Sequence, residues 1–168
     1  MALPLGGIAK EEFRRLQEEL KPWESFLRFQ NPQSPHLTLQ YWPEVMEIEY
    51  HQIVDQANKI AEKSEQFTLK ILGASAFGNR GDDRVLFLDV PFSEPLARLK
   101  KRCPWPSAEP FSPHITLARI RHSQRFAVEK KKIMKVLKGA EFTMFVDRLR
   151  FYAEIDGKKQ TVLEEFVL

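Results

Sequence analysis

The sequence predicts an α+β fold, one domain built of two similar halves, and three observations support this prediction. The chain has 168 residues, 43% apolar and 11% aromatic, a length and composition typical of one globular domain. Segments with the period of strands alternate with segments that have the period of helices. A six-residue phrase also occurs twice, SPHLTL at 34–39 and SPHITL at 112–117, which suggests that one half repeats the other.

The elements expected in the first half follow from local spacing. In chain order they are a short strand at 2–6, a helix at 9–20, strands at 25–29 and 36–42, and a helix at 47–65. Phe13, Leu16 and Leu20 form the apolar stripe of the first helix, and apolar residues recur at three and four spacing in the second. Pro43 ends the strand before it because proline has no backbone N–H to continue a ladder.

The second half is expected to repeat this order. We expect a hairpin of strands 66–74 and 84–90 around the polar turn 78–83, a helix at 95–102, a strand at 114–120, a helix at 126–137, and closing strands at 142–154 and 161–168 around a turn at 156–157. Pro104, Pro106 and Pro110 predict a loop before strand 114–120, because helix and sheet interiors exclude proline. No linker or low-complexity segment divides the chain, so residues 1–168 are expected to form a single domain.

Each copy of the repeated phrase predicts a strand with one apolar face and one reactive face. The Ser-Pro pair favours an extended chain and marks the entry to a strand. Side chains alternate between the faces of a strand, so His36 shares a face with Thr38, and His114 shares a face with Thr116. A histidine at the same place in both copies indicates proton transfer near neutral pH, with one ring as base and the other as acid.

The net charge of +3 is only mildly basic, but the basic residues are unevenly distributed. Between residues 119 and 138 there are eight basic residues and one acid, Glu129. A solvated helix face explains the lysines at 130–138, and a rim that attracts phosphate is the functional alternative. Arg119 and Arg121 lie closer to His114 in sequence and are better candidates for contact with an anion.

The two His-x-Thr motifs, about eighty positions apart, resemble those of the 2H phosphoesterase superfamily. Within it, the chain resembles the RNA 2',3'-cyclic phosphodiesterases, which are also called LigT-like proteins or 2'-5' RNA ligases. The resemblance extends over almost the whole chain, and FSPHITLAR at 111–119 is very close to the family's second motif. It implies a bilobal fold with two antiparallel sheets facing a central groove and helices on the outside.

The resemblance also implies a reaction, the metal-independent opening of a 2',3'-cyclic phosphate at an RNA end to a 2'-phosphate. His36 would protonate the leaving ribose oxygen, and His114 would activate water. The hydroxyls of Thr38 and Thr116 and the guanidinium of Arg119 would stabilise the charge on the phosphate oxygens. No cofactor or metal ion is then expected.

A base-stacking residue is implied at Tyr41, five residues after His36. Stacking of a base on an aromatic ring contributes about 1 to 3 kcal/mol and tolerates any base. The family more often has Phe here, followed by Leu or Ile and Gly, whereas this chain has Tyr41-Trp42-Pro43.

Structural roles are the alternatives for the candidate residues. Threonine suits any strand, an arginine can be a solvated strand end, and aromatic residues belong to cores, which applies to Tyr41, Trp42 and Trp105. His51 and His122 have no repeated context and are interpreted as structural. A metal site on the two repeated histidines lacks further ligands at suitable spacing. The glycines at 73–78 are not followed by the Lys-Ser/Thr of a phosphate-binding loop and predict a turn.

Three functions are compatible with the sequence. They are hydrolysis of RNA 2',3'-cyclic phosphate ends, 2'-5' joining by the same residues, and nucleotide binding without turnover. Both histidines and both threonines of the repeat are intact, which favours an enzyme. The expected partner is RNA with a cyclic phosphate end or a small cyclic nucleotide.

The remaining features predict the location of the protein. The start of the chain lacks the basic lead of a signal peptide, and no stretch approaches the roughly 18 apolar residues of a membrane span. The single Cys103 allows no internal disulfide. We therefore expect a monomer in the cytoplasm, without a membrane partner.

Overall fold

The computed structural model describes residues 1–79, 81–107, 110–155 and 158–168. Its helices are α1 (Gly7–Glu19), α2 (Glu47–Glu62), α3 (Glu94–Arg102) and α4 (Ser123–Val136). Its strands are β1 (Ala2–Pro4), β2 (Leu27–Phe29), β3 (His36–Thr38), β4 (Phe67–Leu72), β5 (Ala74–Asn79), β6 (Asp82–Asp89), β7 (His114–Ile120), β8 (Glu141–Val146), β9 (Arg148–Ile155) and β10 (Lys158–Val167). Short 3-10 turns lie at Lys21–Trp23 and Leu137–Gly139.

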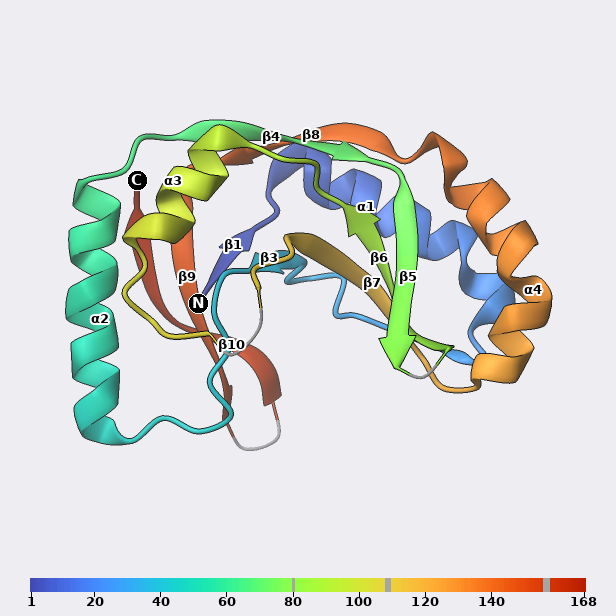
Figure 1. The fold of residues 1–168 in the computed structure, drawn as a ribbon, viewed down its shortest axis with the longest axis horizontal. Coiled ribbons are helices and arrows are strands. Elements are labelled where there is room, and N and C mark those ends of the chain that lie inside the picture. Colours follow the sequence, from blue (N-terminus) through green and yellow to red (C-terminus); the bar gives the residue numbers. More distant parts are fainter. Residues whose placement is uncertain (80, 108–109, 156–157) are drawn as a thin grey trace.

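Two antiparallel sheets organise the described residues, which confirms the expected α+β class. The larger sheet has eight strands, seven of them in the order β10-β9-β1-β3-β7-β6-β5, and β2 pairs with β7 beside β3. The second sheet is the pair β4 and β8. In Figure 1, α2 and α3 lie at the end of the large sheet that carries β9 and β10, and α4 lies at the end that carries β5 and β6.

The two halves meet inside the large sheet, where the repeated phrases form the neighbouring strands β3 and β7. Leu37 of β3 pairs with Leu3 of β1 on one side and with Ile115 of β7 on the other, and Ile115 pairs with Leu88 of β6. All four side chains are fully buried. This row of apolar residues joins four strands from both halves and holds the two motifs in fixed register.

Strand 36–42 is shorter than the sequence suggests, because β3 ends at Thr38. The N–H groups of Leu39 and Gln40 both donate to the carbonyl oxygen of Met1, at 3.0 and 3.1 Å. The neighbouring strand β1 therefore offers no further ladder partner. Residues 39–42 leave the sheet as a loop.

The hairpin expected from strands 66–74 and 84–90 was wrong in its first arm. Gly73, with φ of 83°, divides that arm into β4 and β5. β5 forms the hairpin with β6, while β4 pairs with β8 in the second sheet. Part of the predicted turn, residue 80, lies outside the described residues. Glycine adopts positive φ without steric cost, which lets the chain change sheets here.

The strand expected at 142–154 is likewise two strands, β8 and β9, separated at Asp147. β8 belongs to the small sheet and β9 to the large one, so the chain passes between sheets at this residue. The carbonyl oxygen of Asp147 accepts a hydrogen bond from the Leu168 N–H at 2.8 Å. The closing pair is therefore β9 with β10, and the predicted turn at 156–157 lies outside the described residues.

The four predicted helices are confirmed, with ends that differ by a few residues. α1 and α4 begin two and three residues earlier than expected, at Gly7 and Ser123, because their first turns carry few core-facing side chains. α2 ends at Glu62, where the Ser64 hydroxyl donates to the Ile60 carbonyl at 2.7 Å. No helix in the described part of the chain is both long and apolar enough to cross a membrane.

Candidate active site

The four histidine and threonine side chains of the repeat share one face of the large sheet. The pairing of Leu37 with Ile115 is antiparallel, so His36 comes opposite Thr116, and Thr38 comes opposite His114. The apolar residues on the other face are buried, whereas these four remain partly or fully exposed. The sequence prediction of an apolar and a reactive face is consistent with this burial.

Both histidine rings are held in the same way by the residue two positions earlier. His36 Nδ1 lies 2.8 Å from the Ser34 carbonyl oxygen, and His114 Nδ1 lies 2.8 Å from the Ser112 carbonyl oxygen. A carbonyl oxygen only accepts hydrogen bonds, so Nδ1 must be the protonated nitrogen in both rings. Nε2 of each ring is therefore left to exchange a proton with a ligand. Serine before proline thus orients the ring as well as starting the strand.

His36 packs against Tyr152 of β9, with ring centroids 5.1 Å apart and an angle of 33° between the planes. Burial lowers the pKa of His36, the bond to Ser34 opposes this effect, and the nearby N-terminal amino group adds to it. In the free protein the ring is therefore neutral at a lower pH than an exposed histidine. An anion beside the ring acts in the opposite direction and raises its pKa.

His114 lies among aromatic residues of β5 and β6. The rings of Phe77 and Phe87 each meet it edge-on, with centroids 5.3 Å away. Asp89 is the cross-strand partner of His114, and its carboxylate accepts a hydrogen bond from the Ser75 hydroxyl at 2.7 Å. The two histidines thus have similar backbone anchors but different ring contacts.

A β-bulge in β7 brings Arg119 to the same face as the histidines. In regular alternation, a residue five positions after His114 would point to the opposite face. The register with β6 shifts between Leu86 and Phe87, which pair with Ala118 and Thr116, so Leu117 is the extra residue. Leu117 and Ala118 are both buried in consequence, and Arg119 is exposed. The bulge thus makes Arg119 available to a ligand at the reactive face.

The aromatic candidates separate into an exposed and a packed group. Tyr41 is 74% exposed in the loop after β3. Trp42 packs edge-on against Trp105 and Phe151, at 5.3 and 5.7 Å between centroids. Trp105 is buried, and its Nε1 donates to Gln56 Oε1 at 2.7 Å. Trp105 is therefore a structural anchor, and Tyr41 is the aromatic residue left available for stacking.

The residues that pack around His36 from β9 were not among those predicted from the sequence. Ala2 of β1 pairs with Thr38 of β3 on one side and with Arg150 of β9 on the other. Arg150 therefore lies on the same face as Thr38, and so does Tyr152, two residues further along β9. Arg150 Nε donates to Glu165 Oε2 at 2.6 Å. Burial lowers the pKa of Arg150, but the nearby Tyr152 and Glu165 produce a net rise. Strand alternation alone carries no signal for these neighbours, because the pairing of β9 with β1 joins residues far apart in the sequence.

The Tyr152 hydroxyl is buried and makes no hydrogen bond of good geometry in the described ranges, although it lies close enough to Arg150 to raise the pKa of that guanidinium. Tyr152→Phe is therefore expected to leave stability within about 0.5 kcal/mol of wild type, because no well-formed hydrogen bond is lost. Tyr152→Ala removes the ring that packs on His36 and is expected to lower turnover about fivefold. In an NMR titration of the imidazole, the pKa of His36 should rise toward 6.5 in Tyr152→Ala and stay unchanged in Tyr152→Phe. An unchanged pKa in both variants would contradict the role of Tyr152 in burying the ring.

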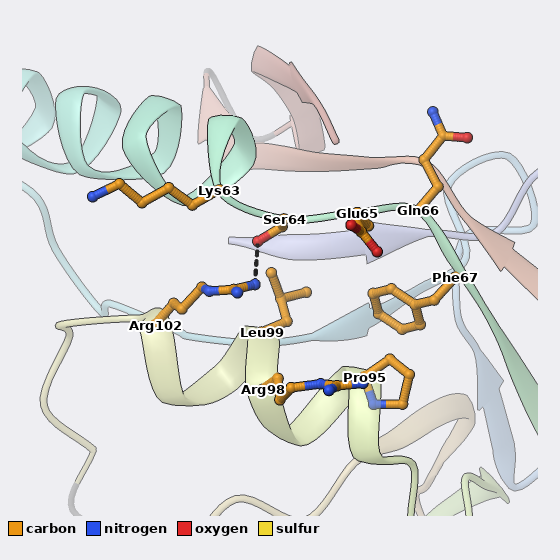
Figure 2. Close-up of a pocket in the computed structure, with 9 residues that line it drawn as sticks. All are labelled: Lys63, Ser64, Glu65, Gln66, Phe67, Pro95, Arg98, Leu99 and Arg102. Carbon is orange, nitrogen blue, oxygen red and sulfur yellow. Dashed lines mark hydrogen bonds between the residues drawn. The ribbon is translucent and has the colours of Figure 1, made fainter.

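The hollow in Figure 2 lies away from the reactive face, between the end of α2 and α3. It has a volume of about 290 Å³, and none of the candidate residues lines it. Its charges are mixed, because Glu65 lines it together with Arg98 and Arg102. Arg102 donates to the Ser64 hydroxyl at 3.2 Å, and Arg98 is paired with Glu94 at 3.4 Å. These pairings give the hollow no clear ligand preference.

The other histidines lie apart from the reactive face. His51 is exposed on α2 beside Tyr50, and His122 is exposed at the start of α4. In the ranges that the structure describes, no group of three or more His, Cys, Asp or Glu residues is placed to hold a metal ion. The reactive face is therefore built from His36, His114, Thr38, Thr116 and Arg119.

Comparison with known proteins gives consistent results for sequence and fold. A family model described as the 2'-5' RNA ligase superfamily matches residues 8–158. The RNA 2',3'-cyclic phosphodiesterase of Aquifex aeolicus (strain VF5) is 26% identical over 149 residues, which cover 82% of this chain and 79% of that protein. Two solved structures, TT0787 of Thermus thermophilus and E. coli LigT complexed with NADP+, have TM-scores of 0.71 and 0.66 at 22% and 20% identity. Each similarity covers 99% of this chain and 95% of the other, which confirms the expected bilobal fold.

Proposed function

Because the chain belongs to the 2'-5' RNA ligase superfamily, the 2H phosphoesterases, we propose that it hydrolyses 2',3'-cyclic phosphate ends of RNA to 2'-phosphates. The observation that carries this proposal is the pair of histidines on one sheet face, each with Nδ1 bound to a backbone carbonyl and Nε2 left over. The relative from Aquifex aeolicus, named for this activity, adds support. The reaction needs no metal ion in this mechanism.

The proposed reaction is an in-line displacement at phosphorus. His114 Nε2 takes a proton from water as the water oxygen forms a bond to phosphorus. The bond between phosphorus and the ribose 3' oxygen breaks, and His36 Nε2 gives its proton to that oxygen. The products are a 2'-phosphate and a 3'-hydroxyl, and the two rings have exchanged protonation states.

The proposed division of roles follows the family resemblance and requires a protonated His36. Burial lowers the pKa of this ring, which disfavours the charged form in the free protein. The negative charge of a bound cyclic phosphate acts in the opposite direction, because an anion within a few ångströms stabilises an imidazolium. Substrate binding thus supplies the proton-donating form of His36 at the moment when it is needed.

Charge that gathers on the phosphate oxygens is stabilised by donors on the same face. The hydroxyls of Thr38 and Thr116 flank the two histidines, since each threonine lies opposite the histidine of the other motif. Arg119 adds a guanidinium from the next exposed position of β7. Preorganised donors of this kind lower the barrier because they need no rearrangement as charge develops. We further propose that the terminal base stacks on Tyr41.

Two other functions use the same site. Joining a cyclic phosphate to a 5'-hydroxyl as a 2'-5' bond replaces water with a ribose hydroxyl and needs the same acid and base. A binding module without turnover would need the phosphate-binding face but no proton transfer, and the two intact His-x-Thr motifs favour the enzyme over it. We propose that residues 1–168 act as one unit, since the large sheet runs through both halves. We also propose that this unit is a monomer and acts in the cytoplasm.

The experiment that tests the proposal is incubation of an RNA oligonucleotide ending in a 2',3'-cyclic phosphate with the protein and EDTA. We expect complete opening to a 2'-phosphate, identified by phosphorus NMR of the product. A 3'-phosphate product would contradict the assigned leaving group, and activity lost with EDTA would contradict the metal-free mechanism. Tight nucleotide binding without turnover would instead support the binding module. Adding a 5'-hydroxyl oligonucleotide tests for the 2'-5' joining reaction in the same assay.

A further inference from the structure

Two arginines stand directly opposite each other at the end of the reactive face. Arg28 of β2 pairs with Arg119 of β7, and the flanking pair, Leu27 with Ile120, is buried on the opposite face. Arg28 and Arg119 are both exposed and therefore point to the side of His114 and Thr116. Directly opposite residues in an antiparallel pair have Cβ atoms about 5 Å apart. The two guanidinium groups thus start from neighbouring positions on one face.

Like charges opposite each other across two strands are unfavourable without an anion between or beside them. In the described ranges, neither Arg28 nor Arg119 makes a hydrogen bond or an ion pair with a side chain. The nearest acids on β6 are already paired, Asp82 with Arg84 and Asp83 with Lys130. Glu129 of α4 is held by Trp23 and Lys132. Among the described residues, the acids in these nearby elements are therefore engaged elsewhere, and none is paired with Arg28 or Arg119.

The position of the arginine pair relative to the histidines indicates which part of a bound substrate Arg28 contacts. β2 and β3 both lie on the same side of β7, so the reactive face carries two rows of side chains. One row has His114, Thr116 and Arg119 along β7, and the other has Thr38, His36 and then Arg28. Tyr41 follows the opposite end of β3, beyond Thr38. A nucleotide bound between Tyr41 and the arginine pair has its reacting phosphate at the histidines. The arginine pair then lies beyond that phosphate, on the side away from Tyr41.

We propose that Arg28 binds the backbone phosphate next to the reacting one, so that the site distinguishes an RNA strand end from a cyclic mononucleotide. This inference rests on the proposed function and adds a substrate preference to it. Arg119 is expected to reach the cyclic phosphate, and Arg28, one strand further out, meets the next phosphodiester of the same strand. Arginine suits this contact because its planar donors match two phosphate oxygens at once.

A charged residue on an edge strand can also serve only to prevent edge-to-edge pairing. In the described residues β2 pairs only with β7, so this structural role applies to Arg28. It does not explain why the charge lies on the reactive face opposite another arginine, where an acid would be stabilising. The two explanations differ in one measurable respect, since only phosphate binding makes the effect of Arg28 depend on substrate length.

The test compares two substrates in four proteins. The substrates are adenosine 2',3'-cyclic phosphate and the dinucleotide ApA with a terminal 2',3'-cyclic phosphate, which adds one internal phosphodiester. The proteins are wild type, Arg28→Ala, Arg28→Lys and the control Arg98→Ala, which removes another exposed arginine, from α3. The quantity measured is the ratio of kcat/KM for the dinucleotide to kcat/KM for the mononucleotide.

In Arg28→Ala we expect this ratio to fall about tenfold, the effect of losing one hydrogen-bonded charge contact. Arg28→Lys should recover only part of it, because lysine keeps the charge but not the paired planar donors, and Arg98→Ala should match wild type. A ratio in Arg28→Ala equal to that of wild type, with the same melting temperature, would overturn the inference. So would an equal fall in Arg98→Ala, which would indicate only a general loss of positive charge.

A second readout keeps the inference testable if the protein turns over neither substrate. Binding of the dinucleotide with a 2'-phosphate end is then measured by calorimetry at several salt concentrations. One lost phosphate contact should reduce the slope of log K against log salt by about 0.7 in Arg28→Ala. Absence of turnover would contradict the proposed function, whereas an unchanged slope would contradict the role of Arg28.

Discussion

Replacing either repeated histidine is expected to abolish most of the activity. His36→Ala and His114→Ala should each lower kcat/KM for opening of a 2',3'-cyclic phosphate end by about 10²- to 10⁴-fold, the usual contribution of a positioned acid or base. Each ring has only Nε2 available, because Nδ1 is bound to the carbonyl of Ser34 or Ser112. No third histidine lies on the reactive face in the described residues to take over either role.

The double variant distinguishes cooperation from two independent effects. The two proton transfers belong to one displacement, so losing one already removes most of the benefit of the other. His36→Ala combined with His114→Ala should therefore be only slightly slower than the worse single variant. If the loss of kcat/KM in the double variant equals the product of the two single losses, the two rings act in separate steps.

The controls are His51→Ala and His122→Ala, which remove exposed histidines outside the reactive face. Both should retain wild-type kcat/KM and melting temperature. The assay is the release of 2'-phosphate from a cyclic-phosphate oligonucleotide in EDTA. A single variant, His36→Ala or His114→Ala, with more than a tenth of wild-type activity would contradict the two-histidine mechanism.

The same mechanism gives a bell-shaped dependence of kcat/KM on pH, because one ring must be protonated and the other neutral. Burial lowers the pKa of His36, so one limb of the curve should have a pKa below 6.5. In the pH dependence of kcat, the limb that belongs to His36 should lie at higher pH than in kcat/KM, because the bound phosphate stabilises the imidazolium.

The repeated phrase explains why much of the site could be predicted from sequence. Strand alternation depends on period alone, so His36 and Thr38 share a face whatever the neighbouring strands are. The apolar residues Leu37 and Ile115 then had to face the core, and both are fully buried. The prediction that two distant phrases belong to one site came from their likeness and the family resemblance, and the structure pairs them directly.

Long-range pairing accounts for what sequence reasoning missed. The division of strand 66–74 at Gly73 depends on β8, which arrives much later in the chain to pair with β4. The bulge at Leu117 is visible only against the register of β6, and strict alternation would have put Arg119 on the buried face. Arg28 carried no local signal at all, since only its pairing with Arg119 brings it to the reactive face.

Leu37→Ala is expected to have a large effect on stability. The Leu37 side chain is fully buried, and truncating such a leucine costs about 2 to 5 kcal/mol of unfolding free energy. The measurement is urea unfolding followed by circular dichroism. The midpoint should fall with little change in m, and the melting temperature should fall by about 2–4 °C for each kcal/mol lost.

Ile48→Ala is the matched control, because Ile48 is 70% exposed on α2 and its truncation should change stability by less than about 0.5 kcal/mol. A loss below about 1 kcal/mol in Leu37→Ala would show that the surrounding side chains collapse into the space.

The same substitution separates the support of the site from its chemistry. Leu37 lies between Leu3 and Ile115, in the row that joins β1, β3, β7 and β6, and its side chain points away from the reactive face. A cavity there weakens the connection between the strands that carry the two histidines but removes no proton donor. Well below its melting temperature, Leu37→Ala should therefore keep kcat within about tenfold of wild type, since only positioning suffers, whereas His36→Ala and His114→Ala should lose more at unchanged stability. A Leu37→Ala protein that is folded but as inactive as the histidine variants would mean that the register between β3 and β7, rather than proton transfer alone, limits the reaction.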